Sequence, residues 1–439
     1  MKYYEIHGGN PLRGEVAISG SKNAALGILP AAIMSEEAVT IRNLPDISDI
    51  RVMLEAIESI GATVHFPIPG DRHIVEICGK NVVDTVVDNA YIRKIRASYY
   101  LIGAMLGRFK HACVAMPGGC NIGKRPTDLH EKGFKELGAK IFIDEKNFLF
   151  HAETSDDPET GKPILRGKEI DLGFPSVGAT INVMLAASMA EGLTVISSAA
   201  KEPHVVNVAE VLNAMGADII GAGTDKIMIN GKAKFHGADC EVIPDQIEAG
   251  TFLCAAAATG GDVTIRHVSS WHLGSILSKL GELGTEICDD GIDGVHITCR
   301  GKLSGDGTRI VTETHPGFPT DMQSQFGPCL ALAEGESSIE ENIFEKRFQY
   351  VPELVRMGAD AVVLSDHKPP KAVFRGVAQL TGADVTATDL RAGAALVIAG
   401  LAARGTTRVH NIEHVLRGYE EFDEKIRQLG GDIRVVEKP

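Results

Sequence analysis

The sequence lacks the features that mark secreted, membrane-spanning or zinc-binding proteins. Its 439 residues contain no apolar run of about 18 residues, the length that a membrane-spanning helix needs. Its start has no apolar core of a signal peptide. None of the eight cysteines stands in a Cys-x-x-Cys pair, and no His/Cys cluster has zinc spacing. We therefore expect a reduced, cytoplasmic protein without membrane insertion, bound metal or cofactor.

Positive charge is also scarce. The chain has 44 Lys and Arg against 58 Asp and Glu, which gives a formal net charge of -14. Such a balance argues against a nucleic-acid partner or another extended polyanion. If the ligand is a small anion, the cations that bind it must be gathered locally.

A short phrase recurs along the chain: the end of an amphipathic helix, then Gly, then an apolar strand. Examples are "IESIGATVH", "LNAMGADII" and "VRMGADAVV". The six glycines, 68 to 78 residues apart, are Gly61, Gly138, Gly216, Gly284, Gly358 and Gly430. Six copies at this spacing predict a repeated architecture, with each Gly at the C′ position of a helix.

A second phrase recurs upstream in most copies: a polar motif, an Ala-rich helix, a turn with Gly and a strand, as in "SVGATINVMLAASMAEGLTVI". These helices are apolar nearly all round, which predicts that they are buried. Each copy therefore predicts a β-α-β-α-β-β unit, in an α/β protein. In the second copy, the polar motif falls in the loop "PGGCNIGKRP", and we expect residues 97–106 to supply the buried helix.

Polar residues begin these buried helices, and a helix N-terminus favours anions. If the units are arranged with symmetry, the N-termini converge and form a site for a small anionic ligand. The residues concerned are Ser21, Lys22, Ser176, Asp245, Asp321, Asp389 and Arg391. The alternative is that the Ser and Asp residues are ordinary N-caps.

Several basic residues precede apolar helices. Lys22 and Asn23 stand in "GSKNAAL", and Arg391 in "TDLRAG". Arg96 ("IRKIRAS") and Arg347 ("EKRFQYVPEL") occupy comparable places. Each arginine alone could form a surface salt bridge, but their repetition favours a shared anion site.

Two further residues could carry chemistry. Asp321, in "HPGFPTDMQ", is an N-cap, a general base or a group that orients a hydroxyl. Cys120 lies among glycines in "PGGCNIGKRP", where Lys124 and Arg125 favour a thiolate or a bound anion. This composition suits a lid over a substrate, although Cys120 could also be an incidental thiol.

These motifs carry a family resemblance. In order along the chain they are "GSKNAAL", "IRAS", "PGGCNIGKRPTDLH", "PSVGATIN", "DQIEAGTF", "HPGFPTDMQ", "GADVTATDLRAGAALV" and "RGYE". Over nearly the whole chain the sequence resembles the UDP-N-acetylglucosamine 1-carboxyvinyltransferase family of enolpyruvyl transferases. The resemblance implies two inside-out α/β barrel domains of three units each. One would comprise residues 21–240 with a lid loop at 117–130, and the other residues 1–20 plus 241–439, with the active site in the cleft between them.

The resemblance also implies a reaction. The family transfers the enolpyruvyl group of phosphoenolpyruvate to the 3′-hydroxyl of UDP-N-acetylglucosamine and releases phosphate, in the first committed step of peptidoglycan synthesis. Cys120 would protonate the methylene carbon, form a thioketal with phosphoenolpyruvate and be alkylated by fosfomycin. Lys22, Arg125 and Arg391 would bind phosphate and carboxylate, Asp321 would take or orient the hydroxyl proton, and Arg347 would lie near phosphoenolpyruvate. The residues implied at the sugar nucleotide are Asn23, Arg96, Arg125, Pro126, Thr127, Asp128, Leu129, Ser176, Val177 and Ile343.

Two other functions stay open. One is the sister transferase that acts on shikimate 3-phosphate, against which the thiol loop and "RPTDLH" argue. The other is a non-catalytic paralogue that only binds sugar nucleotide, against which the full set of candidate residues argues. The chain departs from some relatives at Lys124, Phe174 and Pro175, which puts nucleotide contacts just before Ser176 in doubt.

Overall fold

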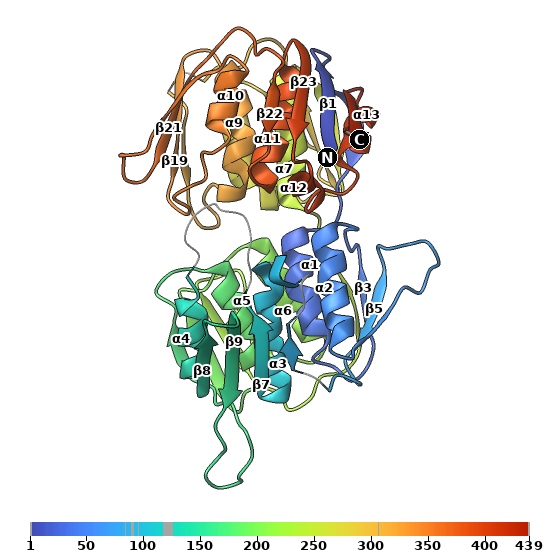
Figure 1. The fold of residues 1–439 in the computed structure, drawn as a ribbon, viewed down its shortest axis with the longest axis vertical. Helices are drawn as coiled ribbons and strands as arrows, with labels where there is room; N and C mark the ends of the chain where they lie inside the picture. Colours follow the sequence, from blue (N-terminus) through green and yellow to red (C-terminus); the bar gives the residue numbers. More distant parts are fainter. Residues whose placement is uncertain are drawn as a thin grey trace. The chain divides into compact units, whose positions relative to one another are not determined.

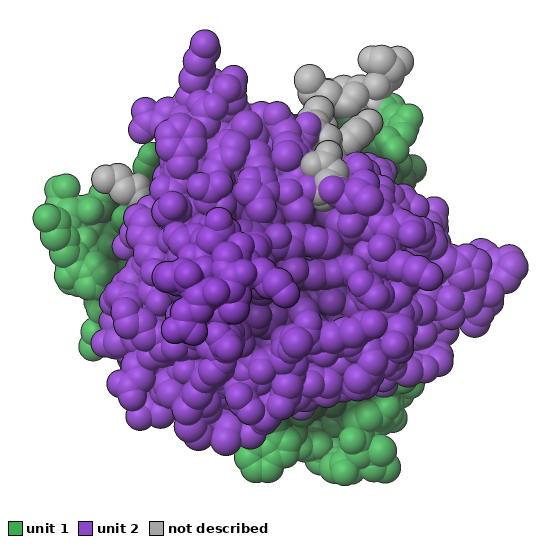
Figure 2. All heavy atoms as spheres, turned by 90° about the horizontal axis from the view of Figure 1, so that it is seen from below, with its two compact units in different colours: residues 1–19, 120–124, 244–439 green, residues 20–119, 125–243 purple. Residues whose placement is uncertain are grey.

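The computed structural model describes residues 2–83, 85–88, 92–94, 96–116, 126–305 and 307–437. They form two compact units, which Figure 2 shows in two colours. Unit 2 is the described part of residues 20–243, and unit 1 is the described part of residues 1–19 and 244–439. Each unit has a buried apolar cluster of its own.

Unit 2 contains three four-stranded sheets. In spatial order, the first is β14 (Ala238–Glu241), β3 (Val39–Arg42), β5 (Val75–Cys78) and β4 (Thr63–His65). The second is β6 (Val86–Val87), β7 (His111–Ala115), β9 (Leu149–Thr154) and β8 (Ala139–Asp144). The third is β10 (Glu169–Asp171), β11 (Leu193–Ser197), β13 (Lys226–Asn230) and β12 (Ile219–Ile220). In each sheet the first two strands pair in parallel and the others antiparallel.

Unit 1 repeats this pattern in three more sheets. One is β22 (Asp384–Thr386), β23 (Gly405–His410), β1 (Lys2–Gly8) and β24 (Asp432–Glu437). Another is β16 (Glu286–Asp289), β17 (Gly294–Thr298), β15 (Asp262–Arg266) and β2 (Arg13–Ala17). The last is β18 (Arg309–Thr312), β19 (Glu336–Glu341), β21 (Lys371–Arg375) and β20 (Asp360–Leu364). The parallel pairs are β22–β23, β2–β15 and β18–β19.

Three helices in each unit are almost entirely buried, as their uniformly apolar sequences predict. In unit 2 they are α1 (Lys22–Ala32), α3 (Tyr100–Phe109) and α5 (Val177–Ala187). In unit 1 they are α7 (Gln246–Thr259), α9 (Gln323–Leu332) and α11 (Leu390–Ala402), and Figure 1 shows them between the sheets of their unit. Cys254 on α7 and Cys329 on α9 are fully buried.

The remaining helices are shorter or only partly buried. In unit 2 they are α2 (Ser48–Ser59), α4 (Asp128–Glu136) and α6 (Pro203–Ala214), with 3-10 turns η1 (Ile92–Lys94) and η2 (Arg96–Tyr99). In unit 1 they are α8 (Gly274–Glu282), α10 (Val351–Arg356), α12 (Glu413–Leu416) and α13 (Phe422–Gln428), with η3 (Ser270–Leu273) and η4 (Thr320–Met322). The apolar stripe of α2 is buried from Ile50 to Ile57. The predicted β-α-β-α-β-β repeat is therefore confirmed, most directly by β10-α5-β11-α6-β12-β13.

The buried helix of the second copy lies three residues later than predicted. It begins at Tyr100 rather than Ala97, because residues 96–99 form the 3-10 turn η2. Its end at Phe109 is set by Lys110, whose backbone is left-handed with φ of 62°. A 3-10 turn leading into a helix continues the same apolar pattern, so the pattern alone does not locate this start.

The six recurring glycines each follow the C-cap residue of a helix. Their φ values lie between 84° and 101°, in the region that favours Gly. They terminate α2, α4, α6, α8, α10 and α13. This confirms the predicted C′ position in every copy.

The chain passes between the units near Ser19–Gly20 and again near Ile243–Pro244. A Cβ on Gly20 would lie 1.8 Å from the carbonyl oxygen of Asn43, so only Gly fits there. On the unit 1 side, Lys425 Nζ donates to Ser19 Oγ and to Glu248 Oε1, both at 2.6 Å. Ser19, where the chain leaves unit 1, is thus held by contacts with α7 and α13.

Candidate active site

Asp321 lies in η4, immediately before the buried helix α9. Its carboxylate does not cap the helix: η4 follows Pro319, and neither η4 nor α9 has a side-chain cap. Asp321 Oδ1 instead accepts a hydrogen bond from Arg347 Nη2 at 2.7 Å. Its Oδ2 accepts one from Arg391 Nη2 at 3.2 Å. The structure thus brings together three of the residues that the sequence singled out.

The two arginines are buried while the carboxylate between them is partly open. The side chains of Arg347 and Arg391 are each 4% exposed, and that of Asp321 is 29% exposed. A guanidinium has five N–H donors, and Arg347 Nε is buried with no acceptor among the described residues. The cluster therefore combines spare cationic donors with an accessible carboxylate, which suits an anionic ligand that also presents a hydroxyl.

The charges of the cluster stabilise one another. Burial opposes ionisation of Asp321, but Arg391 and Arg347 outweigh it and hold the pKa of Asp321 well below its usual range. Burial likewise opposes the charge of Arg391, whereas Tyr419, Asp321 and Asp245 raise the pKa of its guanidinium. In the free protein, Asp321 is therefore a carboxylate and Arg391 a cation near neutral pH.

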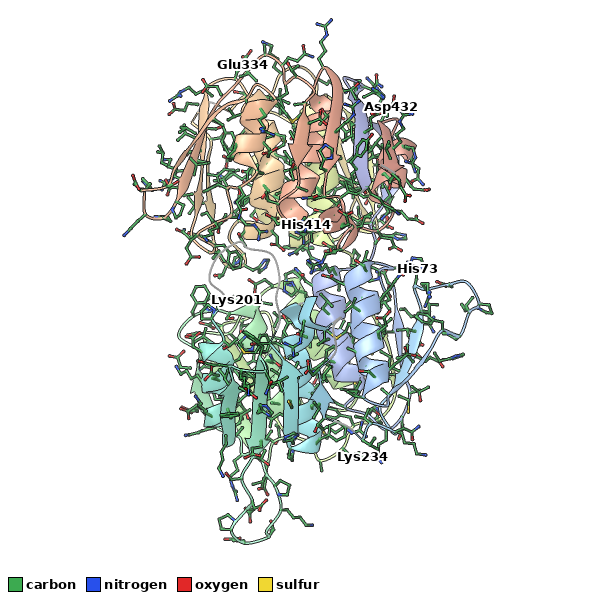
Figure 3. The ribbon with its side chains drawn as sticks, in the orientation of Figure 1. His73, Lys201, Lys234, Glu334, His414 and Asp432 are labelled. Atoms are coloured by element: carbon green, nitrogen blue, oxygen red, sulfur yellow. The ribbon has the colours of Figure 1, made fainter. Side chains whose placement is uncertain are left out.

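The N-termini of the three buried helices of unit 1 converge on this cluster. Arg391 is the second residue of α11, whose N-cap Asp389 accepts from the Arg391 and Ala392 amides. The Arg391 guanidinium lies 5.4 Å from the ring centre of Tyr419. The Tyr419 hydroxyl is 2.8 Å from Thr251 Oγ1 on α7 and accepts from Gln325 Nε2 on α9 at 3.3 Å. The helix α12, on which Figure 3 labels His414, packs against α11.

In unit 2, Lys22 is the first residue of α1 and forms an ion pair with Asp49 near the start of α2. Lys22 Nζ lies 2.9 Å from Asp49 Oδ2, and the two side chains are 12% and 6% exposed. The carboxylate gives the largely buried ammonium an ion-pair partner, which offsets part of the cost of removing it from water. Asn23 follows it and is half-buried.

The other predicted nucleotide residues of unit 2 lie at the starts of α4 and α5, which pack together. His130 on α4 is buried, and its Nδ1 is 2.9 Å from Asn182 Nδ2 on α5. A Cβ on Gly178 would lie 3.1 Å from the His130 ring, so the two helix starts approach closely. Pro126, Thr127, Asp128 and Leu129 precede His130, and Ser176 and Val177 precede Gly178. The structure thus brings these six residues to one place.

The polar residues that begin α1, α5, α7 and α11 also act as N-caps. Ser21 Oγ accepts from the Ala24 amide, and Ser176 Oγ from the Ala179 amide, both at 3.4 Å. Asp245 Oδ1 accepts from the Ile247 amide at 2.7 Å. The capping alternative therefore holds for these residues but not for Asp321.

Some predicted residues lie outside the described part of the chain. They are Cys120 and Arg125, with Lys124 beside them, and the side chain of Arg96. Among the described residues, no three His, Cys, Asp or Glu side chains form a group that could hold a metal ion. Within the same residues, no helix has both the length and the apolar character to cross a membrane.

Sequence reasoning missed the residues that hold the site residues in place. Asp49 carried no signal, because it pairs with Lys22 from another helix. Tyr419 stands in the motif "RGYE", but nothing in the sequence tied it to Arg391. Gln325 donates to the backbone oxygen of Asp321 at 2.9 Å and is separated from Tyr419 by 94 positions. Such contacts join residues that are far apart in the sequence, so they can be identified only in the folded structure.

Comparisons with known proteins identify the family of the chain. A family model for EPSP synthase (3-phosphoshikimate 1-carboxyvinyltransferase) matches residues 6–426. The UDP-N-acetylglucosamine 1-carboxyvinyltransferase 3 of Caldanaerobacter subterraneus subsp. tengcongensis is 48% identical over 433 residues, covering 99% of each chain. The UDP-N-acetylglucosamine 1-carboxyvinyltransferase of Clostridium botulinum is 47% identical over 434 residues, again covering 99% of each. The solved structure of the enolpyruvyl transferase NikO from Streptomyces tendae, 26% identical, has a TM-score of 0.87 and covers 100% of this chain and 99% of that one. The chain therefore belongs to the enolpyruvyl transferase family, among the UDP-N-acetylglucosamine 1-carboxyvinyltransferases.

Proposed function

We propose that the protein transfers the enolpyruvyl group of phosphoenolpyruvate to the 3′-hydroxyl of UDP-N-acetylglucosamine and releases phosphate. This is the first committed step of peptidoglycan synthesis. The observation that carries the proposal is the carboxylate of Asp321 held between the buried cations Arg347 and Arg391. The relatives' names support the same reaction. Both substrates are cytosolic metabolites, so we expect the enzyme to act in the cytoplasm.

The cluster suits an addition followed by an elimination. Arg391 and Arg347 bind the anionic groups of phosphoenolpyruvate, which replaces water around them by fixed donors. Asp321 takes the proton of the 3′-hydroxyl as its oxygen bonds to C2 of the enol, and Cys120 gives a proton to C3. The resulting tetrahedral ketal loses a C3 proton and inorganic phosphate, which restores the enol double bond on the sugar.

Binding of phosphoenolpyruvate should make Asp321 a stronger base. In the free protein, its pKa is lowered because both arginines donate to it. A low pKa makes a carboxylate a poor proton acceptor. When the arginines turn their donors to the substrate's oxygens, this stabilisation weakens and the pKa of Asp321 rises. Asp321 thus becomes a stronger base only when phosphoenolpyruvate is bound.

We assign the sugar nucleotide to the residues predicted from the sequence. In unit 2 these are Asn23, Arg96, Arg125, Pro126, Thr127, Asp128, Leu129, Ser176 and Val177, with Lys22 at the phosphoenolpyruvate anion. In unit 1 it is Ile343. The starts of α4 and α5 approach closely where Gly178 faces the His130 ring, and this supports the assignment because the N–H groups of a helix N-terminus favour an anion.

Phosphate release from phosphoenolpyruvate tests the function directly. We expect release with UDP-N-acetylglucosamine and none above background with shikimate 3-phosphate. Release with shikimate 3-phosphate alone would assign the sister reaction. Absence of release with either, while UDP-N-acetylglucosamine still binds by calorimetry, would support a binding protein without catalysis.

Alkylation tests the proposed role of Cys120. Fosfomycin should inactivate the wild type with the mass of one adduct on the peptide that contains Cys120. Cys120→Asp should keep transfer activity, because a carboxylic acid can also deliver a proton, and should resist fosfomycin. Modification of another cysteine, such as the exposed Cys288, with Cys120 left unmodified would contradict this role.

A further inference from the structure

Glu341, the last residue of β19, is a buried carboxylate that the proposed reaction does not use. It is 1% exposed. Its Oε1 accepts from Thr312 Oγ1 at 2.9 Å, from the Ile343 amide at 2.8 Å and from the Phe344 amide at 3.0 Å. Its Oε2 accepts from Thr320 Oγ1 at 2.9 Å. One carboxylate therefore joins three separate segments of unit 1.

Two of these segments carry residues of the candidate active site. Thr320 is next to Asp321, and both belong to η4. The loop with Ile343 and Phe344 leads to Arg347, whose guanidinium lies 5.6 Å from the ring centre of Phe344. Asp321 and Arg347 are 26 positions apart, yet their carboxylate and guanidinium meet at 2.7 Å. Glu341 is a buried group that contacts both segments.

The ionised form of Glu341 depends on these donors. Burial raises the pKa of this carboxyl above its usual value, whereas the two amides, Arg347 and Thr312 lower it. A buried carboxylate with four donors holds those donors in a narrow range of positions, because losing any one leaves a desolvated polar group unpaired.

We propose that Glu341 is a positioning residue for the transfer reaction, which sets the placement of Asp321 through Thr320 and of the loop that leads to Arg347. The inference rests on the proposed function of Asp321 and Arg347. Glu341 touches neither substrate in this proposal. It acts by holding a base and an anion-binding cation in the relative geometry that the addition step needs.

Substitution of Glu341 and of its neighbour Glu340 tests this role. Glu340 is also buried, but it pairs with Arg309 at 2.6 Å and Lys371 at 3.2 Å. We expect Glu341→Ala to lower kcat roughly 10- to 100-fold, as misplacement of reacting groups does, with a smaller change in KM for either substrate. Glu340→Ala should leave kcat within about twofold, because neither of its partners belongs to the candidate active site. Glu341→Gln should recover most of the activity, since an amide can keep all four contacts if the Thr320 hydroxyl rotates to accept.

Thr320→Val keeps the test available if Glu341→Ala does not fold. This change removes a single hydrogen bond, and we expect kcat to fall several-fold while the melting temperature falls by only a few degrees, because Glu341 Oε2 loses one donor. In the double variant Thr320→Val/Glu341→Ala the effects should not add, because both remove the same contact. Wild-type kcat in a folded Glu341→Ala or Thr320→Val would overturn the proposal. A Glu341→Gln variant as defective as Glu341→Ala would also overturn it, because charge rather than contact would then be required.

A readout independent of activity separates this inference from the proposed function. The Arg347 Nε–H resonance, assigned by comparison with Arg347→Lys, should shift in Glu341→Ala and stay in place in Glu340→Ala. An unshifted resonance in Glu341→Ala would refute the positioning role even in an active enzyme. A wild type that releases no phosphate would instead contradict the proposed function alone.

Discussion

Replacing Asp321 by Asn should lower turnover by roughly 10²- to 10⁴-fold, the usual contribution of a positioned base, without weakening phosphoenolpyruvate binding. Asn keeps the size of the side chain but cannot take the proton of the 3′-hydroxyl. It also frees Arg347 and Arg391 from a competing carboxylate. The affinity for phosphoenolpyruvate should therefore stay equal or increase. Single-turnover kinetics and calorimetry would measure the two effects separately.

A matched control for this change is Asp384→Asn. Asp384 on β22 also pairs with an arginine, Arg408 at 3.8 Å, but is 63% exposed. We expect near-normal turnover and binding for this variant. Normal turnover by Asp321→Asn would show that Asp321 only holds the arginines. Weaker phosphoenolpyruvate binding together with normal chemistry would reverse the proposed roles.

The Asp321→Asn substitution should also change the stability of the fold in a pH-dependent way. The pKa of Asp321 is lower in the folded protein than in the unfolded chain, because Arg391 and Arg347 overcome the effect of burial. Its charge therefore stabilises the fold above about pH 4, the usual pKa of Asp, and this contribution is lost as the pH falls through the lower folded value. The difference in melting temperature between wild type and Asp321→Asn should be largest at pH 6–8 and shrink toward pH 3.

The sequence predicted those parts of the fold that depend on local rules. A Gly that ends a helix and a helix that is apolar on every side leave their mark within about 20 residues, which is why all six C′ glycines and the buried helices were predicted correctly. The start of α3 was displaced because η2 shares its apolar pattern. Local pattern thus identifies an element better than it locates the element's first residue.

The candidate site was predictable only in part. Asp321 and Arg391 stood out because charged residues before apolar helices need an explanation. Whether Asp321 was a cap or a base depended on Arg347 and Arg391, which are 26 and 70 positions away. Glu341 gave no signal, because "IEEN" places two glutamates side by side at a strand end and only burial distinguishes them. Residues that contact substrates can be inferred from type and motif, whereas residues that hold them in place require the tertiary structure.

Replacing Arg391 by Ala should have the opposite signature to Asp321→Asn, a loss of phosphoenolpyruvate binding. Arg391 is a buried cation with a charged partner, and truncation of such a group in a binding site typically costs about 2–5 kcal/mol, or roughly 30- to 5000-fold in affinity. The kcat/KM for phosphoenolpyruvate should fall by that order, while UDP-N-acetylglucosamine binding, measured alone, should change little. Arg391 lowers the pKa of Asp321 more than Arg347 does, so removing Arg391 should raise the pKa of Asp321. The acid limb of the remaining activity should then move to higher pH.

Two comparisons decide what Arg391 contributes. Arg391→Lys keeps the charge but loses the planar pair of donors, so we expect it to recover only part of the affinity. Arg408→Ala removes an arginine on the strand that follows α11, where it is 44% exposed and pairs with Glu5 at 3.1 Å, and should leave phosphoenolpyruvate kinetics unchanged. If Arg391→Ala folds and uses phosphoenolpyruvate normally, Arg391 is a structural partner of Asp321. The anion site must then be built from Arg347 and other cations. If Arg391→Lys is fully active, the positive charge alone is enough to bind phosphoenolpyruvate, and the planar pair of guanidinium donors has no part in recognition.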